Sequence, residues 1–418
     1  MTYISMFPKS MDELNLKPKA LHMTKPEILN ENPDFSLVLG GLLFQFYRWA
    51  RLSGDSLERV RRRVVVIMII AWLPPLVLSM IGGHALGGAI AVPFLYDIET
   101  HVRFLVALPI LICAELIVHD RLRAAVESFL DRRIIVPEEI PAFHRAIGST
   151  LSLRNSFIVE VALLVLVYTL GLWIWRSQVA TDAATWYALR EPSGLHLTLA
   201  GYWYALVSIP IFQFLLLRWY FRFFLWFQFL WRVSKLNLRL IATNPDRSGG
   251  LGFLGSSTYA FAPILFAQGA LLTGLVANRV MYLGENLMDF KVEAAGLLAF
   301  IVVFVLSPLT VFTPQLERAK RRGLGDYGRL ASHYVQGFEE KWVRPRASSQ
   351  EELLGSADIQ SLADLGNSYA VVKEMRLTPF GLKDVMRLAV VTATPLLPLS
   401  LTVFSLEEIV TRLIKILF

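Results

Sequence analysis

Residues 199–240, LAGYWYALVSIPIFQFLLLRWYFRFFLWFQFLWRVSKLNLRL, decide the fold of this chain. No charged residue precedes Arg218, and aliphatic and aromatic side chains dominate throughout. A helix crosses the hydrocarbon core of a membrane with about 20 apolar residues. As one helix, the stretch would be roughly 60 Å long at 1.5 Å per residue, about twice that core. We therefore expect a membrane-spanning helix, bent near Pro210, that continues beyond the membrane as a basic, aromatic segment.

The composition of the whole chain agrees with a membrane protein. Hydrophobic residues make up 55% of the 418 residues and charged residues 18%, and the mean hydropathy is +0.50. Soluble domains carry roughly 25% charged residues. The single cysteine, Cys113, lies in an apolar run, so we expect neither an intrachain disulfide nor a cysteine-based metal site. The polar N-terminus lacks a cleavable signal pattern, so we expect the membrane segments to be retained.

Seven apolar runs are candidates for membrane spans. They are Val64–Met80, Val102–Val118, Ser156–Trp175, the run that starts at Leu199, Ser256–Asn278, Ala294–Phe312 and Leu388–Phe404. The first contains Pro74 and Pro75, which should kink or break a helix. The seventh is short and contains two prolines, so it either spans the membrane or re-enters. The sequence predicts an all-α, polytopic transmembrane helical bundle of six to seven spans, some of them proline-broken, with amphipathic cytoplasmic helices.

The distribution of Lys and Arg predicts the orientation of the spans. The segments 1–63, 120–155, 218–247 and 316–387 hold 34 of the 41 basic residues, whereas 82–101 holds none and 177–198 only Arg190. Cytoplasmic loops carry the excess of basic residues, so the N-terminus and the 316–387 segment are predicted to be cytoplasmic. The net charge of +7 then faces anionic lipid headgroups and does not indicate nucleic acid.

These features divide the chain into four parts. They are a cytoplasmic N-terminal arm with an interfacial helix (1–63), six transmembrane helices (64–315), a cytoplasmic amphipathic helical segment (316–387), and a last transmembrane or re-entrant element followed by a C-terminal amphipathic helix (388–418).

The arginines of the 199–240 stretch fall on one stripe of a helix at 100° per residue. One interpretation is an aromatic belt whose cations reach anionic headgroups. The other is a basic face that lines a pore or an anion path. Both place Arg218 and Arg222 at the cytoplasmic boundary, because an arginine at the bilayer centre costs at least about 2.5–3.5 kcal/mol. The cations assigned to headgroup or anion contact are Arg232, Lys235, Arg239 and Arg247.

Three further ionisable side chains lie at membrane depth. Glu115 and His119 share a face of the second span, and Glu160 lies in the first turns of the third. A buried carboxylate in a membrane needs a partner or water, which His119 would supply to Glu115 and Arg154 to Glu160. These groups either hold helices together or relay protons, since His titrates near neutral pH. The candidate polar pathway is Glu115, His119, Glu160, Arg218 and Arg222.

Residues 250–255, GLGFLG, match the G-x-G-x-x-G pattern of dinucleotide-binding turns. That pattern requires a strand before it and a helix after it, within a βαβ unit. Here a basic aromatic helix precedes it and an apolar run follows. We therefore predict a structural turn, with Asp246 or Ser248 capping the next helix.

The remaining motifs give no indication of catalysis. In YDIETHVR (96–103), Asp97 and His101 are four residues apart and within reach of each other, but two ligands do not make a metal site. The chain lacks a nucleophile elbow, an H-E-x-x-H motif and a Walker loop. We expect no metal, no cofactor and no enzymatic activity.

Four stretches, in this order along the chain, resemble a family of uncharacterised bacterial multi-pass inner-membrane proteins. They are DIETHVRFLVALP (97–109), NPDRSGGLGFLG (244–255), KRRGLGDYG (320–328) and DIQSLADLGNSY (358–369). The resemblance extends over nearly the whole chain. It implies a location in the bacterial cytoplasmic membrane, and it implies no activity and no site residues.

Two functions remain open at this point. The proline-broken helices, the charges at membrane depth and the arginine stripe favour a channel or transporter for a small ion or solute. The alternative is a non-catalytic membrane scaffold or sensor subunit that acts through its cytoplasmic helices. The expected partners are membrane lipids, with anionic headgroups on the cytoplasmic side; the sequence leaves a homo-oligomer open and indicates no nucleic acid.

The predicted orientation can be tested by cysteine labelling in a Cys113→Ser background. A cysteine at position 355 should stay unlabelled by an impermeant reagent in intact cells, because the basic 316–387 segment is predicted to be cytoplasmic. A cysteine in the 177–198 loop should be labelled. Labelling at position 355 in intact cells would contradict the orientation.

Overall fold

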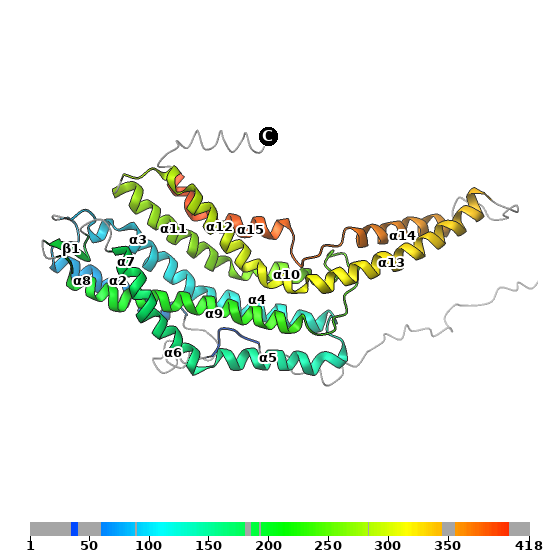
Figure 1. Ribbon diagram of the computed structural model, residues 1–418, viewed down its shortest axis with the longest axis horizontal. Helices are drawn as coiled ribbons and strands as arrows, with labels where there is room; N and C mark the ends of the chain where they lie inside the picture. Colours follow the sequence, from blue (N-terminus) through cyan, green and yellow to red (C-terminus); the bar gives the residue numbers. More distant parts are fainter. Residues whose placement is uncertain are drawn as a thin grey trace, which may run out of the picture. The chain divides into compact units, whose positions relative to one another are not determined.

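The computed structural model describes residues 35–40, 60–87, 90–179, 185–191, 194–282, 284–344 and 356–400. These residues are almost entirely helical, which confirms the all-α class (Figure 1). The helices are α2 (Val60–Ile81), α3 (Ile98–His101), α4 (Leu108–Asp131), α5 (Ile140–Arg154), α6 (Phe157–Leu166), α7 (Leu172–Val179), α8 (Leu199–Trp203), α9 (Ile209–Val233), α10 (Gly252–Ser257), α11 (Ala262–Tyr282), α12 (Lys291–Leu306), α13 (Thr313–Phe338), α14 (Ala357–Lys373), α15 (Leu382–Ala393) and α16 (Leu397–Ser400). Strands β1 (Ala188–Glu191) and β2 (Gly194–Leu197) pair antiparallel within the 177–198 loop.

Six continuous helical stretches in the described residues are long and apolar enough to cross a membrane. They are Val60–Ile81, Ile98–Asp131, Phe157–Ser177, Leu199–Val233, Gly252–Tyr282 and Leu287–Val343. They coincide with the first six predicted spans, so the chain has the helices of a multi-pass membrane protein. Of the seventh predicted span, the structure describes only the part up to Ser400, as α15 and α16.

Several predicted segments lie outside the described residues. They are most of the N-terminal arm, including its interfacial helix, and the C-terminal amphipathic helix that follows residue 400.

Helix α2 runs unbroken through Pro74 and Pro75, so the expected break is absent. A proline leaves the carbonyl four residues before it without its helical donor. The indole Nε1 of Trp203 donates to the Ile70 carbonyl at 3.2 Å, and the Ser208 hydroxyl donates to the Ala71 carbonyl at 2.6 Å. A neighbouring span therefore supplies both missing donors, which is how transmembrane helices tolerate proline.

The helix of the 199–240 stretch ends at Val233 and does not continue to Leu240 as expected. Beyond this point other elements hold the backbone. The Gln315 side-chain amide donates to the Ser234 and Leu236 carbonyls at 2.6 and 2.9 Å, and the Arg239 amide donates to the Ile134 carbonyl at 2.8 Å. These contacts replace the hydrogen bonds of a further helical turn.

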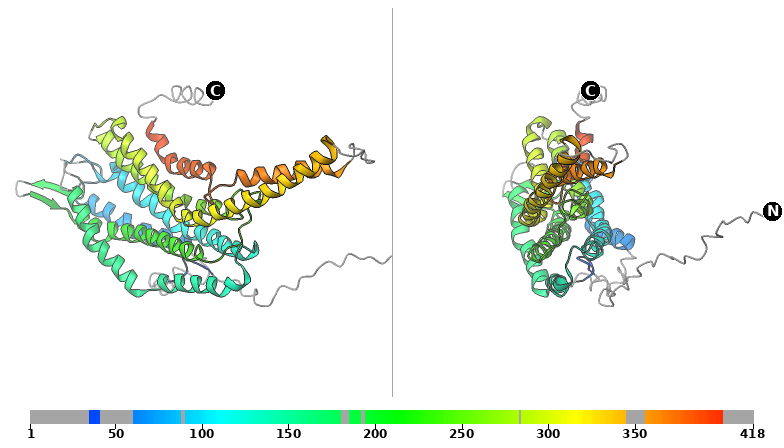
Figure 2. Two further views of the ribbon diagram at one scale, coloured as in Figure 1. Left: turned by 45° about the vertical axis from the view of Figure 1, so that its right-hand side comes forward. Right: turned by 90° about the vertical axis from the view of Figure 1, so that its right-hand side faces the viewer.

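Helices α13 and α14 form a hairpin, and they lie side by side in both figures (Figures 1 and 2). The Tyr334 hydroxyl donates to the Asp358 carbonyl at 3.1 Å. Lys341 and Trp342 both donate to the Asp358 carboxylate at 2.9 Å. These two hydrogen bonds lower the pKa of Asp358 below its usual range. The contacts fasten the start of α14 to the last turn of α13 and to the π-helical segment Glu339–Val343 that follows it.

Close packing of α11 against α15 depends on the missing side chain of Gly269. A Cβ atom added there would lie 2.0 Å from the Thr392 carbonyl oxygen of α15, which is a severe overlap. The small residue allows the two backbones to approach, as is common between membrane helices.

We predict that Gly269→Ala destabilises the bundle by about 1–3 kcal/mol, since α11 and α15 must move apart. The matched control is Gly296→Ala in α12, where an added Cβ meets nothing within 4 Å. This control should be neutral or stabilise by up to about 1 kcal/mol, because alanine favours the helix. Unfolding in a denaturing detergent measures both variants, and equal effects would contradict the packing assignment.

Candidate functional site

The centre of the candidate site is the carboxylate of Glu115 on α4. Its Oε2 lies 2.5 Å from Nη2 of Arg63 on α2, and its Oε1 accepts from Nη2 of Arg222 on α9 at 2.6 Å. The Arg222 guanidinium also lies over the ring of Trp219 at 4.5 Å from the ring centroid. Each oxygen of one carboxylate therefore binds a different arginine, and the three charges join three spans.

A second ion pair lies one helical turn away on α9. Nη2 of Arg218 lies 3.7 Å from Oε1 of Glu160 on α6. We call Arg63, Glu115, Glu160, Arg218 and Arg222 the charge cluster. Every member is buried, with at most 8% of its surface exposed. The cluster therefore draws α2, α4, α6 and α9 together inside the protein.

The charge cluster corrects the expected surroundings of Arg218 and Arg222. We expected the two guanidinium groups to face headgroups or a water-filled vestibule. Arg222 is 3% exposed and Arg218 8%, and both contact carboxylates on neighbouring helices. The physical reason is the one that motivated the expectation: charge is costly in hydrocarbon. The protein meets that cost by pairing instead of by exposure to water.

The expected partners of the two carboxylates also differ from the observed ones. His119 is half-buried, and its Nδ1 has no hydrogen-bond partner among the described residues. Arg154 donates to the Ser36 carbonyl and to the Asn155 side chain, whereas Arg218 lies against Glu160. Of the predicted polar pathway, the structure therefore brings together Glu115, Glu160, Arg218 and Arg222, and His119 stands apart.

Arg63 is the cluster member that sequence reasoning missed. It belongs to the run Arg61-Arg62-Arg63 and was counted with the basic N-terminal arm. A signal was nevertheless present, because Arg63 precedes Ile67, Ala71, Pro75 and Ser79 at intervals of four, and this face of α2 is buried. An arginine in register with an apolar buried face needs an acidic partner on another helix.

The four cations assigned to headgroup or anion contact lie in different places. Arg232 is half-buried, whereas Lys235, Arg239 and Arg247 are exposed. Lys235 lies over the ring of Trp231. Arg247 forms an exposed ion pair with Glu374 at 3.0 Å. The assignment of these four residues to headgroup or anion contact stays a prediction.

The glycine-rich turn binds a carboxylate of the chain itself. Asp246 accepts from the backbone amides of Ser248, Gly250 and Gly252 at 2.7, 3.1 and 2.8 Å. Gly249 and Gly250 adopt positive φ values of 64° and 102°. Successive amides in such turns form an anion-binding concavity. Here Asp246 occupies it and caps the start of α10, as the sequence suggested.

The other ends of the spans are joined by a second polar network around Asp97. Its carboxylate accepts from Thr100, from the Trp186 indole at 2.9 Å and from the Asn278 amide at 2.7 Å. His101 does not pair with Asp97; its Nδ1 accepts from the Trp72 indole at 3.0 Å. Among the described residues, no group of three His, Cys, Asp or Glu could hold a metal ion.

Comparison of the chain with protein families, with curated proteins and with solved structures finds no match. The resemblance drawn from the four sequence stretches therefore stays a prediction.

We predict that Glu115→Gln destabilises the folded protein by about 3–5 kcal/mol, because it leaves two buried arginines without their shared carboxylate. The control is Glu127→Gln on the same helix, whose partner Arg123 has a side chain 41% exposed. This control should cost less than about 1 kcal/mol. Unfolding in a denaturing detergent measures both variants.

A double-mutant cycle then measures the coupling of Glu115 to Arg222. The double variant Glu115→Gln/Arg222→Gln should cost less than the sum of the two single variants, because it removes both charges of one pair. Additive costs, or a Glu115 variant no worse than the Glu127 control, would contradict the assignment of the charge cluster.

Proposed function

We propose that this chain is a non-catalytic membrane scaffold or sensor subunit that presents its α13–α14 hairpin to a protein partner. On this proposal it lies in a bacterial cytoplasmic membrane with the hairpin in the cytoplasm, as the distribution of Lys and Arg indicates. The observation that carries the proposal is the unbroken helical stretch Leu287–Val343, which joins the sixth span to the hairpin.

A continuous helix couples the membrane to the hairpin mechanically. Leu287–Val343 has 57 residues, whereas about 20 helical residues cross the hydrocarbon core. More than half of this stretch therefore extends beyond the core. The elements α12, the 3₁₀ segment Ser307–Phe312 and α13 follow one another without a loop, and α12 and α13 meet at an angle (Figure 1). On this proposal, a movement of the span is passed to the hairpin through this bent helical junction.

The pairing of the buried charges with one another supports a scaffold and argues against a channel or transporter. A conduit would need its ionisable groups to face a water-filled path. Four of the five groups in the predicted polar pathway are instead buried in ion pairs across helices. The two cavities described below lie elsewhere, and no cluster residue lines either of them.

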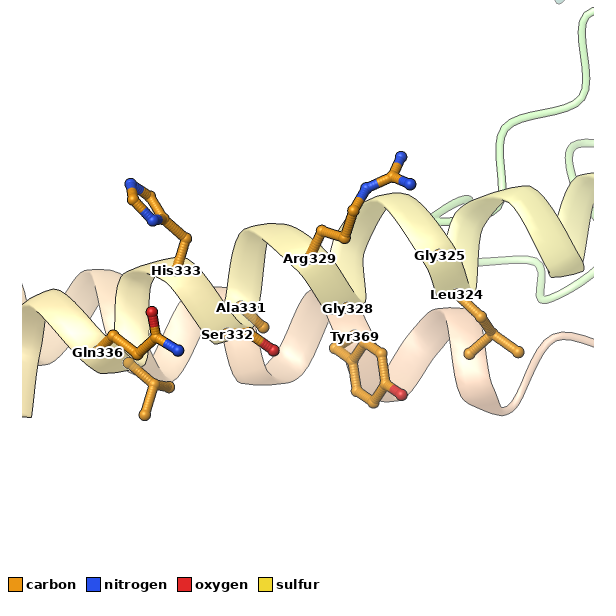
Figure 3. A pocket seen from close by; sticks show the side chains of 10 residues that line it. Leu324, Gly325, Gly328, Arg329, Ala331, Ser332, His333, Gln336 and Tyr369 are labelled. Atoms are coloured by element: carbon orange, nitrogen blue, oxygen red, sulfur yellow. The ribbon is translucent and has the colours of Figure 1, made fainter.

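The hairpin carries an open groove of about 780 Å³ along α13, with Tyr369 of α14 at its wall (Figure 3). Its floor includes the small residues Gly325, Gly328, Ala331 and Ser332. Arg329 and His333 border it, and no carboxylate lines it. Arg329 forms an exposed ion pair with Asp326 at 2.7 Å, which an acidic partner would have to displace or share. A stretch of small residues admits a partner helix at short distance, and the basic border favours acidic side chains. The partner we propose is an amphipathic helix with an acidic face.

Photo-cross-linking in cells tests the proposal. A photoreactive residue in place of Val335, which lines the groove and is 46% exposed, should give a discrete protein adduct. Arg329→Glu should abolish that adduct, because it repels an acidic partner. The control position is Ile158 on α6, an apolar residue 77% exposed, which should cross-link to lipid.

A flux assay separates the two functions. Proteoliposomes with the intact chain should show the same leak of protons, potassium and chloride as protein-free liposomes. A specific flux carried by the protein, or the absence of any adduct at Val335, would contradict a scaffold acting through the hairpin.

A further inference from the structure

A second cavity lies where α9 ends and α13 begins. It has a volume of about 480 Å³, within the range of roughly 300–1,000 Å³ typical of small-ligand sites. Its walls come from the segment 234–240, from the last residues of the 3₁₀ turn that follows α12, from α13 and from Glu139. On the predicted orientation this is the cytoplasmic boundary of the fourth and sixth spans, the level of lipid phosphates.

Three cations line this cavity, and they are Lys235, Arg318 and Arg322. Arg318 and Arg322 are one turn apart on α13, so their side chains share a face. Within the described part of the chain, none of the three cations forms an ion pair with a carboxylate. This contrasts with the neighbouring Arg321, which pairs with Glu317. The three side chains are exposed, so water and salt screen their mutual repulsion, and a bound anion would lower it further.

The remaining wall of the cavity is anchored and mixed in character, with polar residues beside the apolar Leu236, Leu238, Leu240, Val311 and Pro314. The Gln315 side-chain amide holds the Ser234 and Leu236 carbonyls, so the segment after α9 is anchored to α13. Glu139 is the single acidic residue of the lining, and its Oε1 accepts from the Asn237 backbone amide at 3.2 Å. The Glu139 carboxylate is therefore already hydrogen-bonded. Its one negative charge against three positive charges leaves the lining with a net charge of +2.

We propose that this cavity binds a phosphate group, held by Lys235, Arg318 and Arg322. Arginine binds phosphate oxygens through two parallel N–H donors, and lysine contributes a point charge. The phosphate belongs either to the headgroup of an anionic lipid or to a free phosphate ion. The site shares no lining residue with the groove of the hairpin, so a test of phosphate binding does not depend on the proposed function.

Calorimetric titration of the detergent-solubilised full chain tests the site. The probes are dioctanoyl phosphatidylglycerol, inorganic phosphate and dioctanoylglycerol, which lacks a phosphate. Removal of one cation near a phosphate costs about a factor of five in affinity, so Arg318→Gln/Arg322→Gln should weaken phosphate-dependent binding about 25-fold. Arg321→Gln is the control on the same helix. It removes one charge, as each single variant Arg318→Gln or Arg322→Gln does, and it should change binding less than about twofold, whereas each of those should weaken binding about fivefold.

The probes distinguish the two sources of phosphate. Binding of phosphatidylglycerol alone, lost in the double variant, identifies a lipid headgroup. Binding of inorganic phosphate with the same dependence, and displacement of lipid by it, identifies the free ion. All three replaced arginines have exposed side chains, so the variants should fold, and their thermal unfolding checks this. No binding of either phosphate probe, equal binding of dioctanoylglycerol, or an equal effect of Arg321→Gln would overturn the proposal.

Discussion

The ion pairs of Glu115 with Arg63 and Arg222 are the interaction on which the arrangement of the spans depends. A carboxylate in a membrane interior cannot rely on water, and neither can an arginine. Their mutual pairing fixes the relative positions of α2, α4 and α9, and the Arg218–Glu160 pair adds α6. Hydrophobic burial cannot supply such specificity between these helices, because lipid tails are as apolar as the side chains they would replace.

The same requirement explains polar contacts elsewhere in the chain. Trp203 and Ser208 bond the two carbonyls that the prolines of α2 leave open. Asp246 bonds three amides of the glycine-rich turn, and Asp97 collects donors from three segments at the opposite ends of the spans. In each case a polar group on one element forms a hydrogen bond with a polar group on another. These hydrogen bonds position the elements, while the apolar surface faces lipid or the core.

The proposed scaffold role rests on two features, the paired charges between the spans and the helical stretch that joins the sixth span to the hairpin. The charged residues that a conduit would use are bound to one another, whereas the sixth span continues directly into the hairpin. The phosphate site proposed at the base of α13 lies at the junction of these two parts. Occupancy there would alter the charge at the point where the span becomes the hairpin, which is a suitable position for sensing the composition of the membrane.

The sequence alone determined the membrane class and the positions of six spans, and it predicted that the glycine-rich turn is structural. Each follows from local properties: the length of an apolar run, or the absence of a βαβ unit around Gly250–Gly255. Only the tertiary structure decided the partners of the charged groups. Glu115 pairs with Arg63 and Arg222, which are 52 and 107 residues away along the chain, instead of with His119 on its own helix. A hydrophobic pattern places such a charge at membrane depth, but the choice between pairing and exposure to water depends on which helices pack together.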